Sequence, residues 1–216
     1  MRTNPSLPVA AALAVAAAGL LSACASTQAP ASAPASAPAS GTPAQASGPA
    51  APQAAQSILP GSGGLAVCQS ATLKIALDTS QAGGAMGSTY YPVNFTNTAA
   101  TACGMYGYPG LSFVTAAGGT GAQIGAAAQE DPSFGRVVVR VPAGGVAHAW
   151  LQLAQAGNYP ASTCDPATAH VLRVYPPGDT VASYVDVSLS TCASASTPVQ
   201  TVTPVRSGQG ERGVTP

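Results

Sequence analysis

From Leu65 onward, apolar and polar residues alternate along short stretches of the chain. In residues 91–96, for example, Tyr91, Val93 and Phe95 share one phase of a two-residue period, which is typical of a strand with one buried face. The same pattern predicts strands at 73–77, 91–96, 111–115, 137–141, 146–153, 170–175, 184–189 and 199–205. Turn-forming clusters separate the stretches, so the pattern predicts an antiparallel β-sandwich or barrel over residues 65–206.

Two segments of this region depart from the strand pattern. Residues 123–130 are the one place where a short helix fits, but a proline follows at position 132 and a loop fits equally well. Residues 207–216 carry few large apolar side chains and are expected to form a flexible tail.

The N-terminal segment has a different pattern, with an unbroken run of apolar and small residues from Val9 to Leu21 after the single cation Arg2. This run is short of the roughly 20 residues that a membrane-spanning helix needs, and it is typical of a secretory signal over residues 1–23. The residues that close it, Leu21-Ser22-Ala23-Cys24, resemble the bacterial lipobox. The resemblance implies that Cys24 carries a diacylglyceryl group, whose two chains hold the protein stably on the outer face of the cell membrane. An ordinary signal cleaved near Ala23 is the alternative.

Residues 24–64 are built mainly from Ala, Pro, Ser, Gln, Gly and Thr and contain no charged or aromatic residue. Such a segment cannot bury enough apolar area to offset the entropy of ordering it. We expect a disordered tether that spaces the β domain from the membrane, although passive filler has the same composition.

The overall composition narrows the classes of partner. Seven Lys and Arg residues balance seven Asp and Glu residues, which argues against capture of nucleic acid by charge. Besides Cys24, the chain has four cysteines, Cys68, Cys103, Cys164 and Cys192, and no zinc-ligand spacing. In an exported domain, four cysteines favour two disulfides and no metal or cofactor.

An ordered set of motifs gives a more specific resemblance. Asn97-Thr98 follows a predicted strand, Gly107-Tyr108-Pro109-Gly110 follows Cys103, and Pro142-Ala143-Gly144-Gly145 precedes another strand. Cys164, Val174-Tyr175-Pro176-Pro177-Gly178 and Cys192 complete the set. Over roughly residues 68–205 the chain resembles the actinobacterial lipoprotein family of domain-of-unknown-function 4232. The resemblance implies an immunoglobulin-like β-sandwich of about seven to nine strands and assigns no reaction and no catalytic residue.

The disulfide pairing has one preferred solution and one main rival. Cys68 with Cys103 and Cys164 with Cys192 would each close a loop of about 30 residues and contribute roughly 3 to 4 kcal/mol. The nested pairing of Cys68 with Cys192 is not excluded by the sequence.

Candidate ligand contacts lie in residues 146–153. If Leu151 and Leu153 face the core, then His148, Trp150 and Gln152 share the outward phase. An outward tryptophan between polar neighbours can stack on a sugar ring or anchor a protein. The alternatives are that the Trp150 face is the core or that a loop covers it.

No arrangement of residues predicts an enzyme. The chain has two histidines, His148 and His170, and no Gly-x-Ser-x-Gly motif. Asp186 is expected to face water on its strand. We therefore expect a non-enzymatic binding or interaction module for an envelope glycan or protein. An envelope hydrolase with a Ser/His pair and a spacer or surface antigen without a ligand are the alternatives.

Overall fold

The computed structural model describes residues 57–213, which form an all-β fold of thirteen strands with four short helical turns. The strands are β1 (Leu73–Leu77), β2 (Gly83–Ala85), β3 (Ser88–Asn97), β4 (Cys103–Tyr106), β5 (Gly110–Val114), β6 (Gln123–Ile124), β7 (Gln129–Glu130), β8 (Val138–Val141), β9 (Val146–Ala154), β10 (Pro166–Tyr175), β11 (Ser183–Cys192), β12 (Gln200–Val202) and β13 (Arg206–Ser207). The helical turns are η1 (Ser70–Thr72), η2 (Thr79–Gln81), η3 (Ala156–Asn158) and α1 (Ala161–Cys164). Eight of the strands have four or more residues, in keeping with the expected sandwich.

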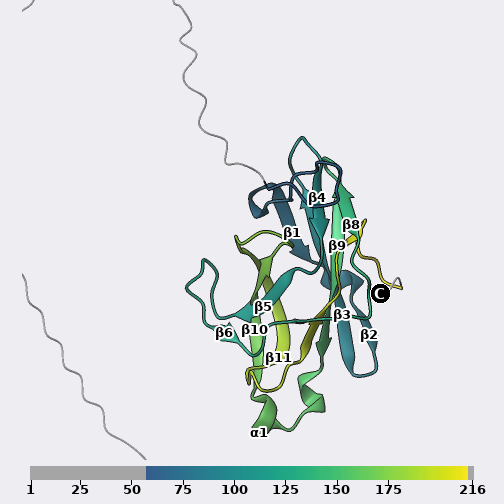
Figure 1. Cartoon of the computed structure of the whole chain (residues 1–216). Helices are drawn as coiled ribbons and strands as arrows, with labels where there is room; N and C mark the ends of the chain where they lie inside the picture. Colours follow the sequence, from purple (N-terminus) through teal and green to yellow (C-terminus); the bar gives the residue numbers. More distant parts are fainter. Residues whose placement is uncertain (1–56, 214–216) are drawn as a thin grey trace, which may run out of the picture. The chain divides into compact units, whose positions relative to one another are not determined.

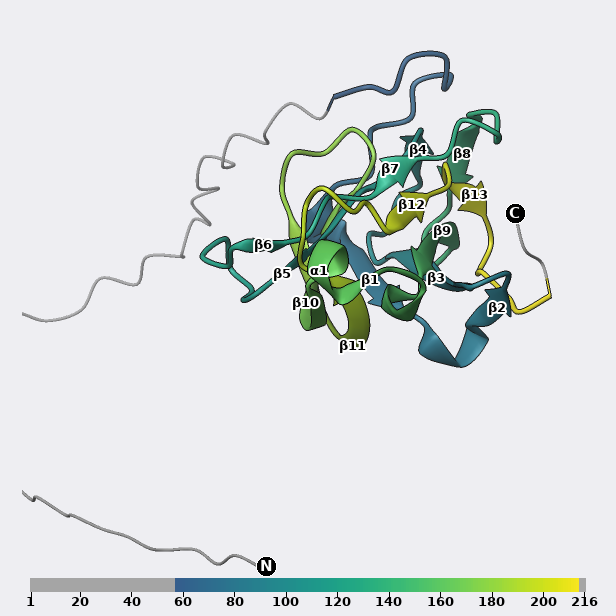
Figure 2. The ribbon, with the colours of Figure 1, turned by 90° about the horizontal axis from the view of Figure 1, so that it is seen from below.

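The strands form two main sheets (Figures 1 and 2). One has the order β1-β3-β9-β12-β7, with β2 added beside β3 and β13 beside β9, and the other has the order β11-β10-β5-β6. A separate ribbon pairs β4 with β8. All pairs are antiparallel except β12 with β7. Within the described residues, no helix is long and apolar enough to cross a membrane.

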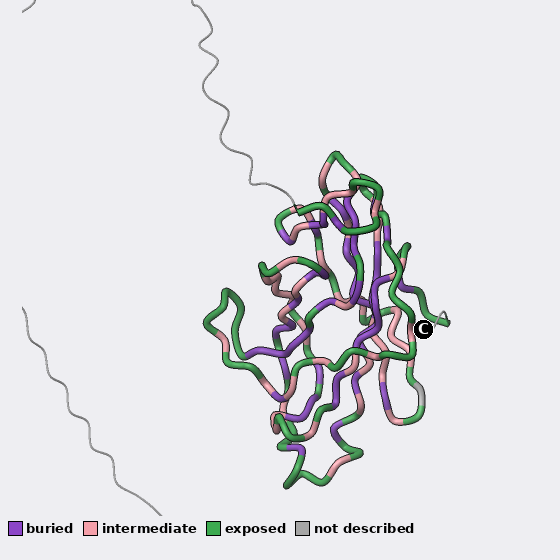
Figure 3. The backbone as a smooth tube through the Cα atoms, viewed as in Figure 1, coloured by how far each residue is buried: buried purple, intermediate pink, exposed green. Residues whose placement is uncertain are grey.

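The core lies between the inner faces of the two sheets, where the tube in Figure 3 is buried. Its largest side chains include Phe95 on β3, Phe113 on β5 and Leu172 on β10, all fully buried. Phe95 stands opposite Ala147 in the β3–β9 register, so a bulky residue is matched with a small one. Burying each large apolar side chain contributes about 1.5 to 3 kcal/mol, which makes this alternation the main source of stability.

Asn97 ends β3 as a fully buried polar residue with all of its polar atoms bonded. Its Nδ2 donates to the carbonyl oxygens of Thr101, Val141 and Pro142, and its Oδ1 accepts from the Ala99 backbone N–H. A buried amide is tolerated only when it is satisfied in this way. Asn97 therefore joins the end of β3 to the turn after β8.

Two disulfides join Cys68 to Cys103 and Cys164 to Cys192, which confirms the preferred pairing. The first closes a loop that contains β1, β2 and β3, and the second joins α1 to the end of β11.

The folded part begins before Leu65, where the sequence predicted the end of the tether. Ile58 forms a β-bridge with Ala66, and the Leu59 side chain is buried. A Cβ at Gly104 would lie 2.9 Å from a Leu59 methyl carbon, so glycine makes room for this contact. The predicted boundary at residue 64 is therefore wrong for residues 57–64. The signal segment, Cys24 and the tether up to residue 56 lie outside the described residues.

Candidate functional site

The three expected ligand contacts lie on β9 in the predicted phase but are not open to a ligand. Ala149 and Leu151 are fully buried in the core, as expected, and His148, Trp150 and Gln152 alternate with them. Trp150 is nevertheless only 3% exposed and His148 only 9% exposed. Gln152 is half-buried, and its Nε2 donates to Ser88 Oγ. The expectation of an outward, accessible tryptophan is wrong, and the alternative of a covered one describes the structure.

The chain after β12, residues 203–212, which we call the C-terminal strap, lies against this part of the sheet. It runs beside β9, where β13 pairs Arg206 with His148, and then crosses the outer side of β9 and β3. Gly208 N–H donates to the Val146 carbonyl, and Gly210 N–H donates to Asn94 Oδ1. The predicted flexible tail is therefore wrong for residues 207–212, which are held by hydrogen bonds.

The strap depends on a glycine at its closest approach to the sheet. A Cβ at Gly210 would lie 2.3 Å from the Pro92 Cβ and 3.3 Å from the His148 ring. Real Cβ atoms do not approach so closely, so any other residue would lift the strap from the sheet. Beyond this point, Arg212 donates to the Ser80 carbonyl and to Gln81 Oε1 through its Nη2 and backbone N–H.

A hydrogen bond to the strap fixes the tautomer of His148. Its Nδ1 lies 2.9 Å from the Gly208 carbonyl oxygen, which can only accept, so Nδ1 carries the proton. Burial lowers the pKa of His148 below 6.5 and the nearby Arg206 charge lowers it further, while the Gly208 bond acts in the opposite direction. The imidazole ring meets the Trp150 ring edge to face, with centroids 6.0 Å apart. His148 is thus a neutral structural residue at pH 7.

The geometry of a serine hydrolase is missing from residues 57–213. Neither His148 nor the exposed His170 hydrogen-bonds to a serine or a carboxylate there. A group of three His, Cys, Asp or Glu side chains that could hold a metal ion is likewise missing from this part of the chain.

An open cleft occurs on the other side of β3, where the sandwich is less tightly closed. On the inner face of β3, Phe95 and Val93 are fully buried, whereas Tyr91 and Thr89 are half-buried. The cleft has two parts that share Tyr91, with volumes of about 660 and 190 Å³. We call it the Tyr91 cleft. The larger part is lined by Leu77, Thr79, Ala82, Tyr91, Asp186, Val187, Ser188 and Leu189. The smaller part is lined by Thr89, Tyr91, Leu153, Ala154, Gln155, Ala156, Gly157 and Ser190.

The opposite wall of the cleft is the edge strand β11, which carries an irregularity at this place. Ala169 pairs with Leu189 and Val171 pairs with Asp186, so β11 has one more residue than β10 between these pairs. Such a bulge redirects side chains on an edge strand. It falls on Val187 and Ser188, which line the cleft. Asp186 is exposed, as the sequence predicted.

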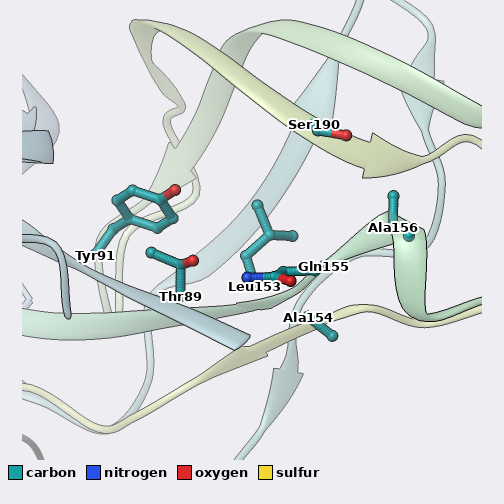
Figure 4. Close-up of a pocket in the computed structure, with 8 residues that line it drawn as sticks. Thr89, Tyr91, Leu153, Ala154, Gln155, Ala156 and Ser190 are labelled. Carbon is teal, nitrogen blue, oxygen red and sulfur yellow. The ribbon is translucent and has the colours of Figure 1, made fainter. Parts of the chain in front are cut away.

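The cleft combines an apolar floor with unpaired polar groups. Tyr91, Leu77 and Val187 pack against the core from its margin. Figure 4 shows Tyr91, Thr89 and Leu153 projecting from the seven-stranded sheet towards β11, which carries Ser190. Among the described residues, no hydrogen-bond partner is found for the hydroxyls of Tyr91, Thr79 and Ser188. The cleft therefore presents donors and acceptors beside an aromatic ring, which is the composition of a small binding site.

Only part of the Tyr91 cleft could be predicted from the sequence. The phase shared by Tyr91, Val93 and Phe95 places Tyr91 on the inner face. Outside the cleft, the Tyr108 hydroxyl donates to the Asp131 carbonyl. That Tyr91 stands at an opening depends on where β11 passes, which no local pattern encodes.

Comparison with protein families gives one match, over residues 68–206, to the model described as Domain of unknown function (DUF4232). Comparison with curated proteins and with solved structures gives no match.

Proposed function

The chain belongs to the DUF4232 family, and we propose that this member is a lipid-anchored, extracytoplasmic and non-enzymatic binding module. The anchor rests on the sequence Leu21-Ser22-Ala23-Cys24, which fits the lipobox at all four positions. The membrane lipid bound through Cys24 is then the first partner. An envelope glycan or protein, held by the β domain, is the second.

The Tyr91 cleft is the observation that supports binding. By comparison, the Trp150 side chain is buried, and the Tyr108 hydroxyl donates to the Asp131 carbonyl. Tyr91 alone among these three combines a half-buried ring with a hydroxyl that has no partner in the described residues.

The position of the cleft suits a domain attached by its N-terminal end. Residues 57–67 lie beside β4, because Val67 bridges to Gly104. Figure 1 places β4 at one end of the sandwich and α1 at the other, and the smaller part of the cleft includes Gly157, which lies just before α1. The described chain therefore begins beside β4, at the end of the sandwich away from the smaller part of the cleft.

A first experiment tests the anchor. Cells that express the full chain are labelled with a palmitate analogue, and membrane and medium fractions are compared with those of Cys24→Ser. We expect label on the wild-type chain and its loss, with release from the membrane, in the variant. Unlabelled wild-type protein in the medium would contradict the anchor.

A second experiment tests binding in intact cells. A photocrosslinking amino acid replaces Tyr91 in one strain and Tyr106 in another. Tyr106 is 46% exposed on β4 and lies outside the cleft, so it is a matched control for surface encounters. We expect discrete adducts at position 91 that are missing at position 106. Equal adduct patterns at the two positions, or none at either, would favour a spacer or surface antigen without a ligand.

A further inference from the structure

We propose that the Tyr91 cleft takes an uncharged saccharide, one ring of which stacks on the Tyr91 side chain. This inference rests on the proposed binding function and names the chemical class of its ligand. A pyranose ring has apolar C–H faces and a rim of hydroxyl groups. It therefore needs an aromatic face surrounded by hydrogen-bonding groups, and the cleft provides both.

The charge of the lining argues against anionic ligands. The two parts of the cleft contain no Lys, Arg or His, and Asp186 is their one acidic residue. An anionic polymer would find no cation there and would be repelled by Asp186. The remaining polar groups are hydroxyls, amides and backbone atoms, including Thr79, Ser188 and Gln155. These groups suit a neutral ligand that is rich in hydroxyls.

The lining favours a saccharide over an extended peptide that would add a strand to β11. Strand addition needs a regular, accessible edge, and bulges are a common way of preventing it. β11 is bulged at Val187 and Ser188. In addition, β1 contacts β11 on the same side of the sandwich.

Tyr91 lines both parts of the cleft, so a ligand longer than one sugar unit could contact residues on both sides of the ring. One direction leads towards Thr79 and Ser188, and the other towards Ser190 and Gly157. We therefore expect an oligosaccharide to bind more tightly than the corresponding monosaccharide.

The test is calorimetric titration of the full chain with neutral tetrasaccharides of glucose, mannose and N-acetylglucosamine, and with tetragalacturonate as the anionic comparison. We expect at least one neutral tetrasaccharide to bind and tetragalacturonate to bind at least about tenfold more weakly. Tyr91→Leu keeps apolar contact with the core and removes the flat ring, so affinity should fall about tenfold or more. Tyr91→Phe keeps the ring and should stay within a few-fold of the wild type.

Two further variants separate the cleft from the rest of the surface. Ser188→Arg fills the mouth of the cleft from an exposed position and should abolish binding without unfolding the protein. Tyr106→Leu changes an exposed tyrosine outside the cleft and should bind like the wild type. Thermal unfolding of each variant reports whether it is folded.

Three results would overturn the saccharide proposal. The first is that the folded chain binds none of the neutral tetrasaccharides. The second is that Ser188→Arg and Tyr91→Leu bind as well as the wild type, and the third is that the adducts at position 91 contain only peptide. The last result would leave the proposed binding function intact and change its ligand to a protein.

Discussion

Trp150 and Tyr91 lie on neighbouring strands, and each has the opposite exposure to the one expected from the direction of its side chain. Trp150 points outward from β9 and is only 3% exposed, whereas Tyr91 points inward from β3 and is half-buried at an open cleft. Alternation along a strand decides towards which side a residue points. It does not decide whether that side is covered, because cover comes from chain segments that are distant in sequence.

The chain segments that lie next to Trp150 and Tyr91 differ. Beside Trp150 the strap hydrogen-bonds to the backbone of that residue, with Thr203 N–H donating to the Trp150 carbonyl and Trp150 N–H donating to Thr203 Oγ1. At Tyr91 the strand β11 lines an open cleft with Val187, Ser188 and Leu189. The comparison predicts four graded effects.

Removing the covered ring should have the largest effect. Trp150→Ala deletes a large buried side chain, and the free energy of unfolding should fall by about 3 to 5 kcal/mol. Urea unfolding measures the change. A loss below about 1 kcal/mol would show that the ring is not packed as described.

Removing the cover should have the next largest effect. A chain that ends after Val205 loses β13 and the hydrogen bonds made by residues 206–212, at about 0.5 to 1.5 kcal/mol each, while the bonds between Thr203 and Trp150 stay, so we expect a loss of about 2 to 4 kcal/mol. Trp150 is the single tryptophan of the chain, so its fluorescence reports directly on exposure. The emission should shift to longer wavelength and become accessible to acrylamide. Unchanged emission would mean that the strap does not cover Trp150.

Removing the open ring should cost less. Tyr91→Ala leaves a shallow gap at the margin of the core rather than a closed cavity, and we expect a loss of about 1 to 2 kcal/mol. Tyr91→Phe should be close to neutral, because the hydroxyl has no partner in the described residues. If urea unfolding gave a loss for Tyr91→Ala as large as that for Trp150→Ala, the contrast between the two sites would be refuted.

The smallest effect should be a pH dependence at His148. Because the pKa of His148 is lowered by burial and by Arg206, protonation favours the unfolded chain. The stabilisation is complete above the ordinary pKa of 6.5 and is lost as the pH falls from there through the lowered value. His148→Gln should reduce the difference in urea midpoint between pH 7.5 and pH 5.5. His170→Gln, at an exposed position, should retain it.

Much of the fold follows from the sequence because two-residue alternation is a local signal. β1 was predicted with its observed bounds, and β3, β9, β10 and β11 within a few residues. The prediction missed β4, since Cys103-Gly104-Met105-Tyr106 contains a glycine and lacks alternation. It also missed β13, because two residues are too few to show alternation and the strand forms by pairing with β9.

The candidate site was less predictable than the fold for the same reason. The phase of Trp150 was right, but the Gly- and Ser-rich residues 207–210 gave no sign that they would lie along β9 and β3. Tyr91 was placed correctly on an inner face, yet its accessibility depends on the bulge in β11, about 95 residues further along the chain.

The Cys68–Cys103 bridge has a mechanical consequence for a domain held from its N-terminal end. Tension that enters at residue 57 can detach Ile58 and Leu59, but at Cys68 it meets a covalent link to β4. The enclosed loop, which contains Leu77, Thr79 and Tyr91, cannot be drawn out while that link holds.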